Sequence, residues 1–268
     1  MPIGSRPPTV LSIAGSDSGG GAGIQADLKA FARCGVHGMT AITAITAQNT
    51  VGVFAVEAVA PEMIVAQIQA VVEDIGVDAV KIGMLGTAKT VETVVEALGP
   101  VGSTPIVLDP VMVAESGAVL LDDAARTALV ERLLPLATVV TPNIPEARAL
   151  TGAAEQESQE DLAREVLALG PVAVVVTGGH SKRAVDLFFD GSEAAAIEGE
   201  RHPDGAAHGS GCTHASALAA FLARGETPLE AARKAREVAS AAIAAGLRDI
   251  GAGPGPVDVF DLTSTFQP

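Results

Sequence analysis

Short runs of apolar residues alternate along this chain with longer stretches in which apolar positions recur every three or four residues. The short runs predict buried strands, and the longer stretches predict helices with one apolar face. The first unit predicts a strand over residues 9–14, a helix over 24–34 and a strand over 39–45. The alternation then continues through helices over 61–74, 87–98 and 122–134 and strands over 79–82, 106–108 and 139–141.

The second half of the chain predicts a strand over 173–177, two strand-like runs near 184–189 and 194–198, and helices over 212–224 and 228–245. Strands that alternate with helices are typical of an α/β fold with a parallel, doubly wound central sheet. No linker interrupts the pattern, so we expect one domain over residues 1–268. Residues 52–58 alternate only weakly and predict either a small hairpin that projects as a lid or an ordinary edge strand.

Composition places the chain among globular proteins. Its 268 residues are enough for one large domain, which buries roughly three quarters of the surface of the unfolded chain. The two cysteines, Cys34 and Cys212, make no disulfide framework, and the first residues lack the basic and apolar regions of a secretory signal. No apolar run approaches the ~18 residues of a membrane helix. We therefore expect a cytoplasmic protein without a membrane partner.

Charge narrows the class of ligand. The formal net charge is -15 at pH 7, which disfavours nucleic acid as a partner because phosphate contacts need clustered Lys and Arg. A small phosphorylated ligand would then be held by backbone N–H groups and a divalent cation more than by a basic patch.

A glycine-rich turn stands directly before the predicted helix over 212–224. Gly209, Ser210 and Gly211 allow several backbone N–H groups to point at one spot, and the positive end of the helix dipole adds to them, which predicts a phosphate site. Cys212 falls in the first helical turn, where the dipole is expected to lower the pKa of a thiol below about 8.5. It is therefore a candidate base or nucleophile. The alternative is a buried structural cysteine behind a capping loop.

In a doubly wound sheet, ligands bind beyond the carboxyl ends of the strands, so we expect site residues at these positions. The first is the stretch 13–27, where the strand that ends near Gly15 runs into a glycine-dense turn. Residues 21–26 match a dinucleotide-binding pattern only weakly, and the next strand ends without an acidic residue to hold a ribose, which argues against a nicotinamide or flavin site. The chain has no Gly-Lys pair, which excludes a Walker loop. Asp27 follows in the first turn of the predicted helix, as a site carboxylate or as one that the helix dipole favours.

Three further positions suggest recognition of a flat ring. The carboxamide of Gln48 offers an acceptor and two donors in one plane, which complements the edge of an aminopyrimidine. Met84 and Val111 can clamp such a ring, since the chain has neither Trp nor Tyr. The alternatives are a solvated loop glutamine and ordinary core residues.

Carboxylates follow two of the later strands. Asp109 precedes a proline after the strand 106–108 and is a candidate Mg²⁺ ligand, or a residue that caps a turn. Asn143 and Glu146 follow the strand 139–141, and Glu146 is a second acidic group for the metal or a carboxylate that starts a helix. We expect His37, His202 and His214 to be solvated or to make local hydrogen bonds.

Taken in order, segments that cover nearly the whole chain resemble the ribokinase-like family, and within it the hydroxymethylpyrimidine and phosphomethylpyrimidine kinases of thiamine biosynthesis. The last segment is the most specific, because ribokinase relatives generally carry an aspartate where this chain has Cys212, and the pyrimidine kinases carry a cysteine. The segments are IAGSDSGGGAGIQADLKAF, TAQNTVGV, KIGMLG, VLDPVMV, LLPLATVVTPNIPEA, VTGGH, DLFFDG and HGSGCTHASALAA.

The resemblance implies a three-layer α/β/α fold, a homodimer, and ATP- and Mg²⁺-dependent phosphorylation of a hydroxymethyl-aminopyrimidine and then of its monophosphate. It implies that residues 209–212 form the catalytic anion site and that the metal binds at Asp109 and Glu146. The implied substrate-binding residues are Gly15, Asp27, Gln48, Met84 and Val111, and the implied nucleotide-binding residues are Asn143, Thr177 and Gly179.

The chain departs from the family pattern where the family usually carries a lysine directed at the phosphates. Thr177 stands there, and Lys81, Lys182 or Arg183 are candidate replacements. Residues 114–118 and 207 also differ from the family. Two alternatives therefore remain, a pyridoxal kinase of the same superfamily and a catalytically weak protein that senses the pyrimidine.

Overall fold

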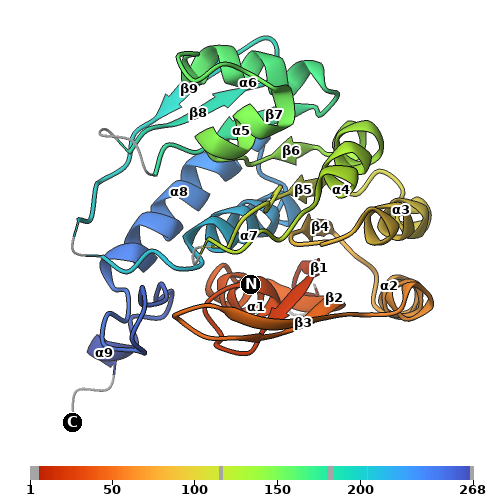
Figure 1. Ribbon diagram of the computed structural model, residues 1–268, viewed down its shortest axis with the longest axis horizontal. Coiled ribbons are helices and arrows are strands. Elements are labelled where there is room, and N and C mark those ends of the chain that lie inside the picture. Colours follow the sequence, from red (N-terminus) through yellow and green to blue (C-terminus); the bar gives the residue numbers. More distant parts are fainter. Residues whose placement is uncertain (1–5, 115–116, 180–183, 204, 266–268) are drawn as a thin grey trace.

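A computed structural model describes residues 6–114, 117–179, 184–203 and 205–265 of the chain. Within them, one sheet runs through the molecule in the order β3-β2-β1-β4-β5-β6-β7-β8-β9, with helices on both faces (Figure 1). The strands are β1 (Thr9–Asp17), β2 (His37–Gln48), β3 (Val53–Ala58), β4 (Ala79–Ile82), β5 (Ile106–Leu108), β6 (Val139–Val140), β7 (Ala173–Val176), β8 (Asp186–Phe189) and β9 (Ala194–Ile197).

The centre of the sheet is parallel, from β2 through β1, β4, β5 and β6 to β7. β3 at one edge and β8 and β9 at the other pair antiparallel with their neighbours. Parallel strands need helical crossovers between them, and these crossovers cover the faces of the sheet. The carboxyl ends of six parallel strands therefore meet at one edge of the sheet.

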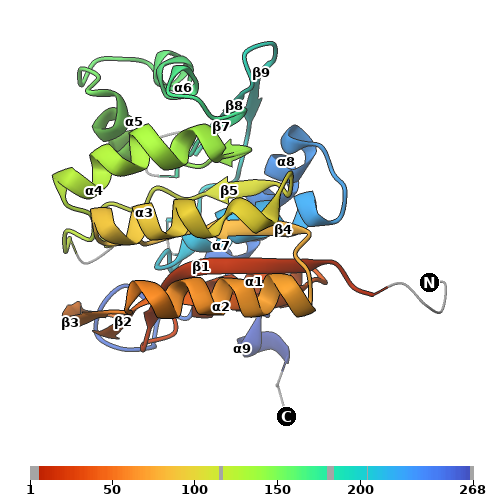
Figure 2. The same cartoon turned by 90° about the vertical axis from the view of Figure 1, so that its right-hand side faces the viewer.

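Two apolar clusters pack on the two faces, because successive side chains of a strand point in opposite directions. In β1, Val10 belongs to the cluster with α1, α7 and α8, and Leu11 belongs to the cluster with α2 to α6 (Figure 2). The helices are α1 (Gly23–Arg33), α2 (Pro61–Asp74), α3 (Ala88–Ala97), α4 (Asp123–Ala128), α5 (Ile144–Thr151), α6 (Gln159–Ala168), α7 (Ser210–Ala223), α8 (Pro228–Ala244) and α9 (Leu262–Thr265). The predicted three-layer, mainly parallel α/β/α fold is confirmed.

The predicted strands and helices are present, with ends that differ by at most three residues, except that the helix predicted over 122–134 divides into α4, a π-helical turn (Leu129–Leu133) and a 3-10 turn (Leu134–Leu136). The helix predicted over 212–224 begins two residues earlier, at Ser210, so the phosphate turn forms part of its first turn. The helices α5, α6 and α9 were not predicted. None of the helices in the described residues combines the length and the apolar character that a membrane span requires.

Residues 52–58 form the edge of the sheet. β3 pairs antiparallel with the end of β2, and the two strands are joined by a tight turn in which the N–H of Asn49 donates to the carbonyl oxygen of Gly52 at 3.1 Å. The segment is thus both a hairpin and an edge strand. Nearly all of its side chains are exposed, with Phe54 70% and Val56 53% exposed. The sheet therefore ends in an apolar edge that no described residue covers.

Candidate active site

A cavity of about 430 Å³ opens where the parallel strands end, beside the first turn of α7. This is the edge of the sheet at which the sequence predicts a ligand site. All the predicted site residues except Asp27 contribute to its wall. They are Gly15, Gln48, Met84, Asp109, Val111, Asn143, Glu146, Thr177, Gly179, Gly209, Ser210, Gly211 and Cys212.

The turn at the start of α7 has the backbone of an anion site. Gly209 is the N-cap, with a φ of 82° in the left-handed region that favours glycine. Within the described part of the chain, the N–H groups of Gly209, Gly211 and Cys212 donate no hydrogen bond, whereas that of Ser210 donates to the carbonyl oxygen of Ala207 at 2.9 Å. Three donors therefore remain for an anion, next to the positive end of a 14-residue helix.

Cys212 lies in this turn with part of its surface open to the cavity. Burial, with a further contribution from the carboxylates of Asp109 and Asp27, raises the pKa of its thiol to about 12, although the charge of Lys81 opposes this shift. The expectation that the helix dipole lowers this pKa is wrong. Loss of water and two neighbouring carboxylates outweigh the half positive charge at the helix end.

Lys81 is a fully buried cation at the floor of the site. Its Nζ lies 2.9 Å from Oδ1 of Asp27 and 3.7 Å from Oδ2 of Asp109. Burial alone would lower its pKa, but Asp27, Cys212 and Asp109 outweigh burial and hold the pKa above its usual value. Lys81 therefore stays charged and is engaged with carboxylates.

Asp27 lies behind the cavity wall, and it is fully buried. Besides the contact with Lys81, its carboxylate accepts hydrogen bonds from Oγ of Ser12 at 2.6 Å and from Oγ of Ser216 at 2.7 Å. The helix begins at Gly23, so Asp27 belongs to its second turn and the prediction of the first turn is wrong. Its partners are three buried polar side chains on β1, β4 and α7.

Two carboxyl groups face the cavity from β5 and α5. Oδ2 of Asp109 is buried and has no hydrogen bond among the described residues. Burial and the charge of Asp109 together raise the pKa of Glu146 to about 8; burial also raises the pKa of Asp109. A cation bound between these carboxyl groups would stabilise their ionised forms.

These two carboxylates suit a metal ion that takes its remaining ligands from water and from the phosphates of the substrate. Among the residues described, no group of three or more His, Cys, Asp or Glu side chains could enclose a metal ion. Mg²⁺ is commonly bound by one or two carboxylates, with waters and substrate phosphates in its other positions. Oδ2 of Asp109, to which no described residue donates a hydrogen bond, and its position near Glu146 suit such an ion.

Gln48 ends β2 on the opposite side of the cavity. Its Oε1 accepts a hydrogen bond from Oγ1 of Thr46 at 3.2 Å, and its Nε2 has no hydrogen bond among the described residues. Gly15 lies within β1, where a Cβ atom would come 2.7 Å from Cε of Met84. Glycine at this position therefore lets Met84 lie over the strand in the cavity wall.

Thr177 and Gly179 line the cavity at the end of β7. The N–H of Thr177 donates to the carbonyl oxygen of Pro142 at 2.8 Å, and Thr177 also forms a parallel bridge with Asn143. The three predicted nucleotide-binding residues are thus brought together. Lys182, Arg183 and the altered position Glu115 lie outside the described residues.

A buried polar cluster of Asp186, His214 and Arg236 lies beside Thr177, and the sequence reasoning missed it. Oδ1 of Asp186 accepts the N–H of Gly178 at 2.9 Å and lies 3.6 Å from Nη1 of Arg236, while Oδ2 lies 3.6 Å from Nε2 of His214. His214 is 4% exposed, so the expectation of a solvated or locally bonded residue is wrong. An isolated Asp or His in a sequence gives no sign of such pairing.

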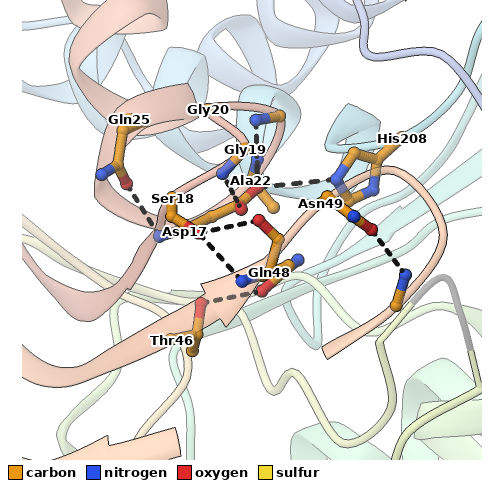
Figure 3. Close-up of polar contacts among 12 residues, drawn as sticks. Asp17, Ser18, Gly19, Gly20, Ala22, Gln25, Thr46, Gln48, Asn49 and His208 are labelled. Carbon is orange, nitrogen blue, oxygen red and sulfur yellow. Dashed lines mark hydrogen bonds and ion pairs between the residues drawn. The ribbon is translucent and has the colours of Figure 1, made fainter. Parts of the chain in front are cut away.

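The sequence reasoning also missed Asp17 and His208, which both line the cavity. Asp17 ends β1 and accepts backbone hydrogen bonds from the glycine-rich turn that follows it (Figure 3). An Asp directly before a run of glycines is a signal for such a turn, because its carboxylate bonds to N–H groups two or more residues ahead.

Comparison with known proteins places this chain. The model of the family described as phosphomethylpyrimidine kinase matches residues 17–258. The chain belongs to the phosphomethylpyrimidine kinase family. It is therefore a phosphotransferase, and the resemblance seen in the sequence is confirmed.

Two solved structures and a curated relative support this placement. A hydroxymethylpyrimidine/phosphomethylpyrimidine kinase of Rhizobium meliloti is 50% identical over 256 residues, which cover 93% of this chain and 96% of the relative. The phosphomethylpyrimidine kinase of Clostridium difficile has a TM-score of 0.76 at 43% identity, covering 85% of this chain and 96% of that one. An ADP complex of Bacillus subtilis pyridoxal kinase has a TM-score of 0.88 at 38% identity, covering 97% and 100%.

Proposed function

We propose that this phosphomethylpyrimidine kinase family member, as a single kinase domain, uses ATP to phosphorylate 4-amino-5-hydroxymethyl-2-methylpyrimidine and then its monophosphate, giving the diphosphate for thiamine biosynthesis. The observation that carries the proposal is one cavity that holds the carboxamide of Gln48 at one side and, at the other, the N–H groups of residues 209, 211 and 212, which donate to no described residue. A planar polar ring and a transferring phosphoryl group need these two features.

The acceptor binds at the end of the cavity formed by β1, β2 and β4. The Nε2 of Gln48, which donates to no described residue, is available to the ring nitrogen beside the exocyclic amine, and Met84 and Val111 line the wall with apolar surface. Gly15 lets the side chain of Met84 lie against β1 in this wall. Asp27 contributes from behind the wall, by holding Lys81 in place.

In the first step, the hydroxyl oxygen of the acceptor attacks the γ-phosphorus of ATP, the bond to the bridging oxygen breaks, and ADP leaves. The thiolate form of Cys212, which the charge of Lys81 favours, accepts the hydroxyl proton and becomes the thiol. The N–H groups at 209, 211 and 212 stabilise the charge that spreads over the transferring phosphoryl oxygens, where one donor of this kind is worth on the order of 10²–10³ in rate.

Asp109 and Glu146 would hold Mg²⁺ together with the phosphates. The ion supplies a positive charge that neutralises the phosphate oxygens of the nucleotide during transfer. Its presence would also lower the pKa of both carboxyl groups, which burial and a neighbouring carboxylate raise, Asp27 for Asp109 and Asp109 for Glu146. Asn143, Thr177 and Gly179 are the proposed contacts of the nucleotide at the neighbouring strand ends.

A pyridoxal kinase activity is the second candidate, since pyridoxal kinases have the same fold at 38% identity. The higher identity to the named pyrimidine kinases, 50%, and the paired presence of Gln48 and Cys212 favour the pyrimidine. One coupled ADP-release assay with the pyrimidine alcohol, its monophosphate and pyridoxal as acceptors tests this. Turnover of pyridoxal alone would reverse the assignment, and tight binding of the pyrimidine without ADP release would indicate a sensor.

We further propose a cytoplasmic homodimer that binds no nucleic acid. The exposed apolar residues of β3, at an edge that no described strand pairs with, support self-association, because an uncovered edge of this kind is a template for pairing with another chain. For the compartment, the free cysteines Cys34 and Cys212 suit a reducing environment. Light scattering of the parent and of Phe54→Lys would test the dimer, with a monomeric parent as the contradicting result.

A further inference from the structure

The first glycine-rich turn binds its own carboxylate. Oδ1 of Asp17 accepts the N–H of Gly19 at 2.8 Å, and Oδ2 accepts the N–H groups of Gly21 at 3.0 Å and Ala22 at 2.8 Å (Figure 3). These donors are therefore occupied and are not available to a phosphate. The glycines of this turn therefore serve a purpose other than binding an anion.

The same carboxylate faces the residue that precedes the anion turn. Nε2 of His208 lies 3.6 Å from Oδ2 of Asp17, and the two residues are 7% and 2% exposed. The backbone of His208 is fixed as well. Its backbone N–H donates to the carbonyl oxygen of Gly255 at 3.3 Å, and its carbonyl oxygen accepts the N–H of Val257 at 3.0 Å. Asp17 and His208 thus join two segments that are 191 positions apart in the chain.

The turn that contains Gly21 and the turn that contains Gly209 pack directly against each other. A Cβ on Gly21 would lie 2.3 Å from Cδ2 of His208, and a Cβ on Gly209 would lie 1.8 Å from the carbonyl oxygen of Gly21. Both distances are far below van der Waals contact. Each turn therefore sets the position of the other.

The first turn is also tied to the acceptor end of the cavity. Oγ of Ser18 donates to the carbonyl oxygen of Gln48 at 2.7 Å and accepts the N–H of Gln48 at 2.9 Å (Figure 3). A continuous path of contacts then runs from Gln48 through Ser18 and Asp17 to His208, which is bonded covalently to Gly209. This path connects the proposed ring-recognition group with the proposed anion site.

We propose that Asp17 and His208 are a positioning pair that holds the anion site of residues 209–212 at a fixed distance from the acceptor pocket at Gln48. The inference rests on the proposed phosphoryl transfer. Neither side chain needs to touch the reacting atoms. A displacement of about 1 Å between the reacting groups is enough to cost on the order of 10²-fold in rate.

The experiment compares Asp17→Asn, His208→Leu and His208→Gln with the parent. We expect kcat for the pyrimidine alcohol to fall roughly 10- to 100-fold in the first two variants, with KM for both substrates within about twofold, because only the transition state needs the fixed geometry. His208→Gln keeps a donor toward Asp17 and should recover part of the rate. The double variant should be no slower than the slower single variant, since both remove one contact.

A second measurement separates positioning from folding. Affinity for ADP with aluminium fluoride in the presence of the pyrimidine should fall by the same factor as kcat, while affinity for ADP alone and for the pyrimidine alone is kept. Asp78→Asn is the matched control, because Asp78 accepts the N–H of Thr9 at 2.8 Å at the other end of β1. It should leave kcat unchanged.

The outcomes are distinct. Unchanged kcat in folded variants, or a rise in KM for the pyrimidine alone, overturns the positioning role. If Asp17→Asn does not fold, the comparison of His208→Leu with His208→Gln decides, and equal rates in these two overturn it. A parent that releases no ADP with any pyrimidine contradicts the proposed function instead.

Discussion

Asn143 and Glu146 cap each other at the start of α5. Oδ1 of Asn143 accepts the N–H of Glu146 at 2.8 Å, and Oε2 of Glu146 accepts the N–H of Asn143 at 2.9 Å. This capping box fixes the Glu146 carboxyl against the cavity wall, close enough to Asp109 for their charges to interact. One carboxyl group therefore serves the start of a helix and faces the proposed metal site.

The first prediction concerns the pH dependence of stability. The pKa of Glu146 is near 4.5 in its usual state and about 8 in the folded protein, so the folded state binds more protons between these values. Stability without divalent cations should then fall as pH rises from about 4.5 to 8. Glu146→Gln keeps the cap and should remove this contribution. Urea midpoints at several pH values measure the difference, with the exposed Glu62→Gln as control, and equal slopes for parent and Glu146→Gln would contradict it.

The second prediction concerns recognition of the ring. Gln48→Ala should weaken pyrimidine binding by roughly 1–3 kcal/mol, because polar atoms of the ligand are left unpaired in a buried site. Affinity for ADP should not change. Calorimetric titration of both ligands measures this, and Gln48→Glu, which keeps size but replaces the donor amide, is the control. A Gln48→Ala variant that binds the pyrimidine as tightly as the parent removes Gln48 from the site.

The third prediction concerns the position where the family carries a lysine. Thr177 lines the cavity at the end of β7, so a lysine there would place a cation near the nucleotide. Thr177→Lys should lower KM for ATP or raise kcat, because a charge-assisted contact to phosphate is added. Thr177→Met adds a similar length without charge and should do neither. If Thr177→Lys improves neither constant, another residue such as Lys182 already supplies the cation.

The fourth prediction separates the two phosphoryl transfers. An alcohol must lose a proton, whereas a phosphate monoester, with a second pKa near 6, already presents an anionic oxygen at neutral pH. Cys212→Ala should lower kcat/KM for the alcohol by ~10²–10⁴, the usual loss of a general base, and lower it much less for the monophosphate. The backbone N–H of residue 212 is retained, so the anion site should still serve both steps.

Its measurement uses both acceptors at one pH and one Mg²⁺ concentration. Cys212→Ser, which keeps a small polar side chain, is the matched control and should fall between the parent and Cys212→Ala. Equal losses on the two acceptors would show that the side chain shapes the site and does not take the proton.

The sequence alone determined the layered fold and the edge of the sheet where the site lies. Strands such as 79–82 and 106–108 are short, continuous apolar runs, and helices such as 61–74 repeat their apolar positions with the helical period, so each is encoded locally. Parallel strands end at one edge of their sheet, so Gln48, Asp109 and Thr177 were predicted near one another although they are far apart in the chain. The helices α5 and α6 were missed because their periodic stretches are short.

Only the tertiary structure decided which charges meet and how far water is excluded. Lys81 and Asp27 are 54 positions apart, and Asp17 and His208 are 191 apart, so no local pattern encodes either pair. The thiol of Cys212 shows the consequence, because its place at a helix start predicted a lowered pKa and its burial beside Asp109 and Asp27 raises it. Local sequence sets backbone conformation, whereas electrostatic energies depend on every group within several ångströms, and those groups come from distant parts of the chain.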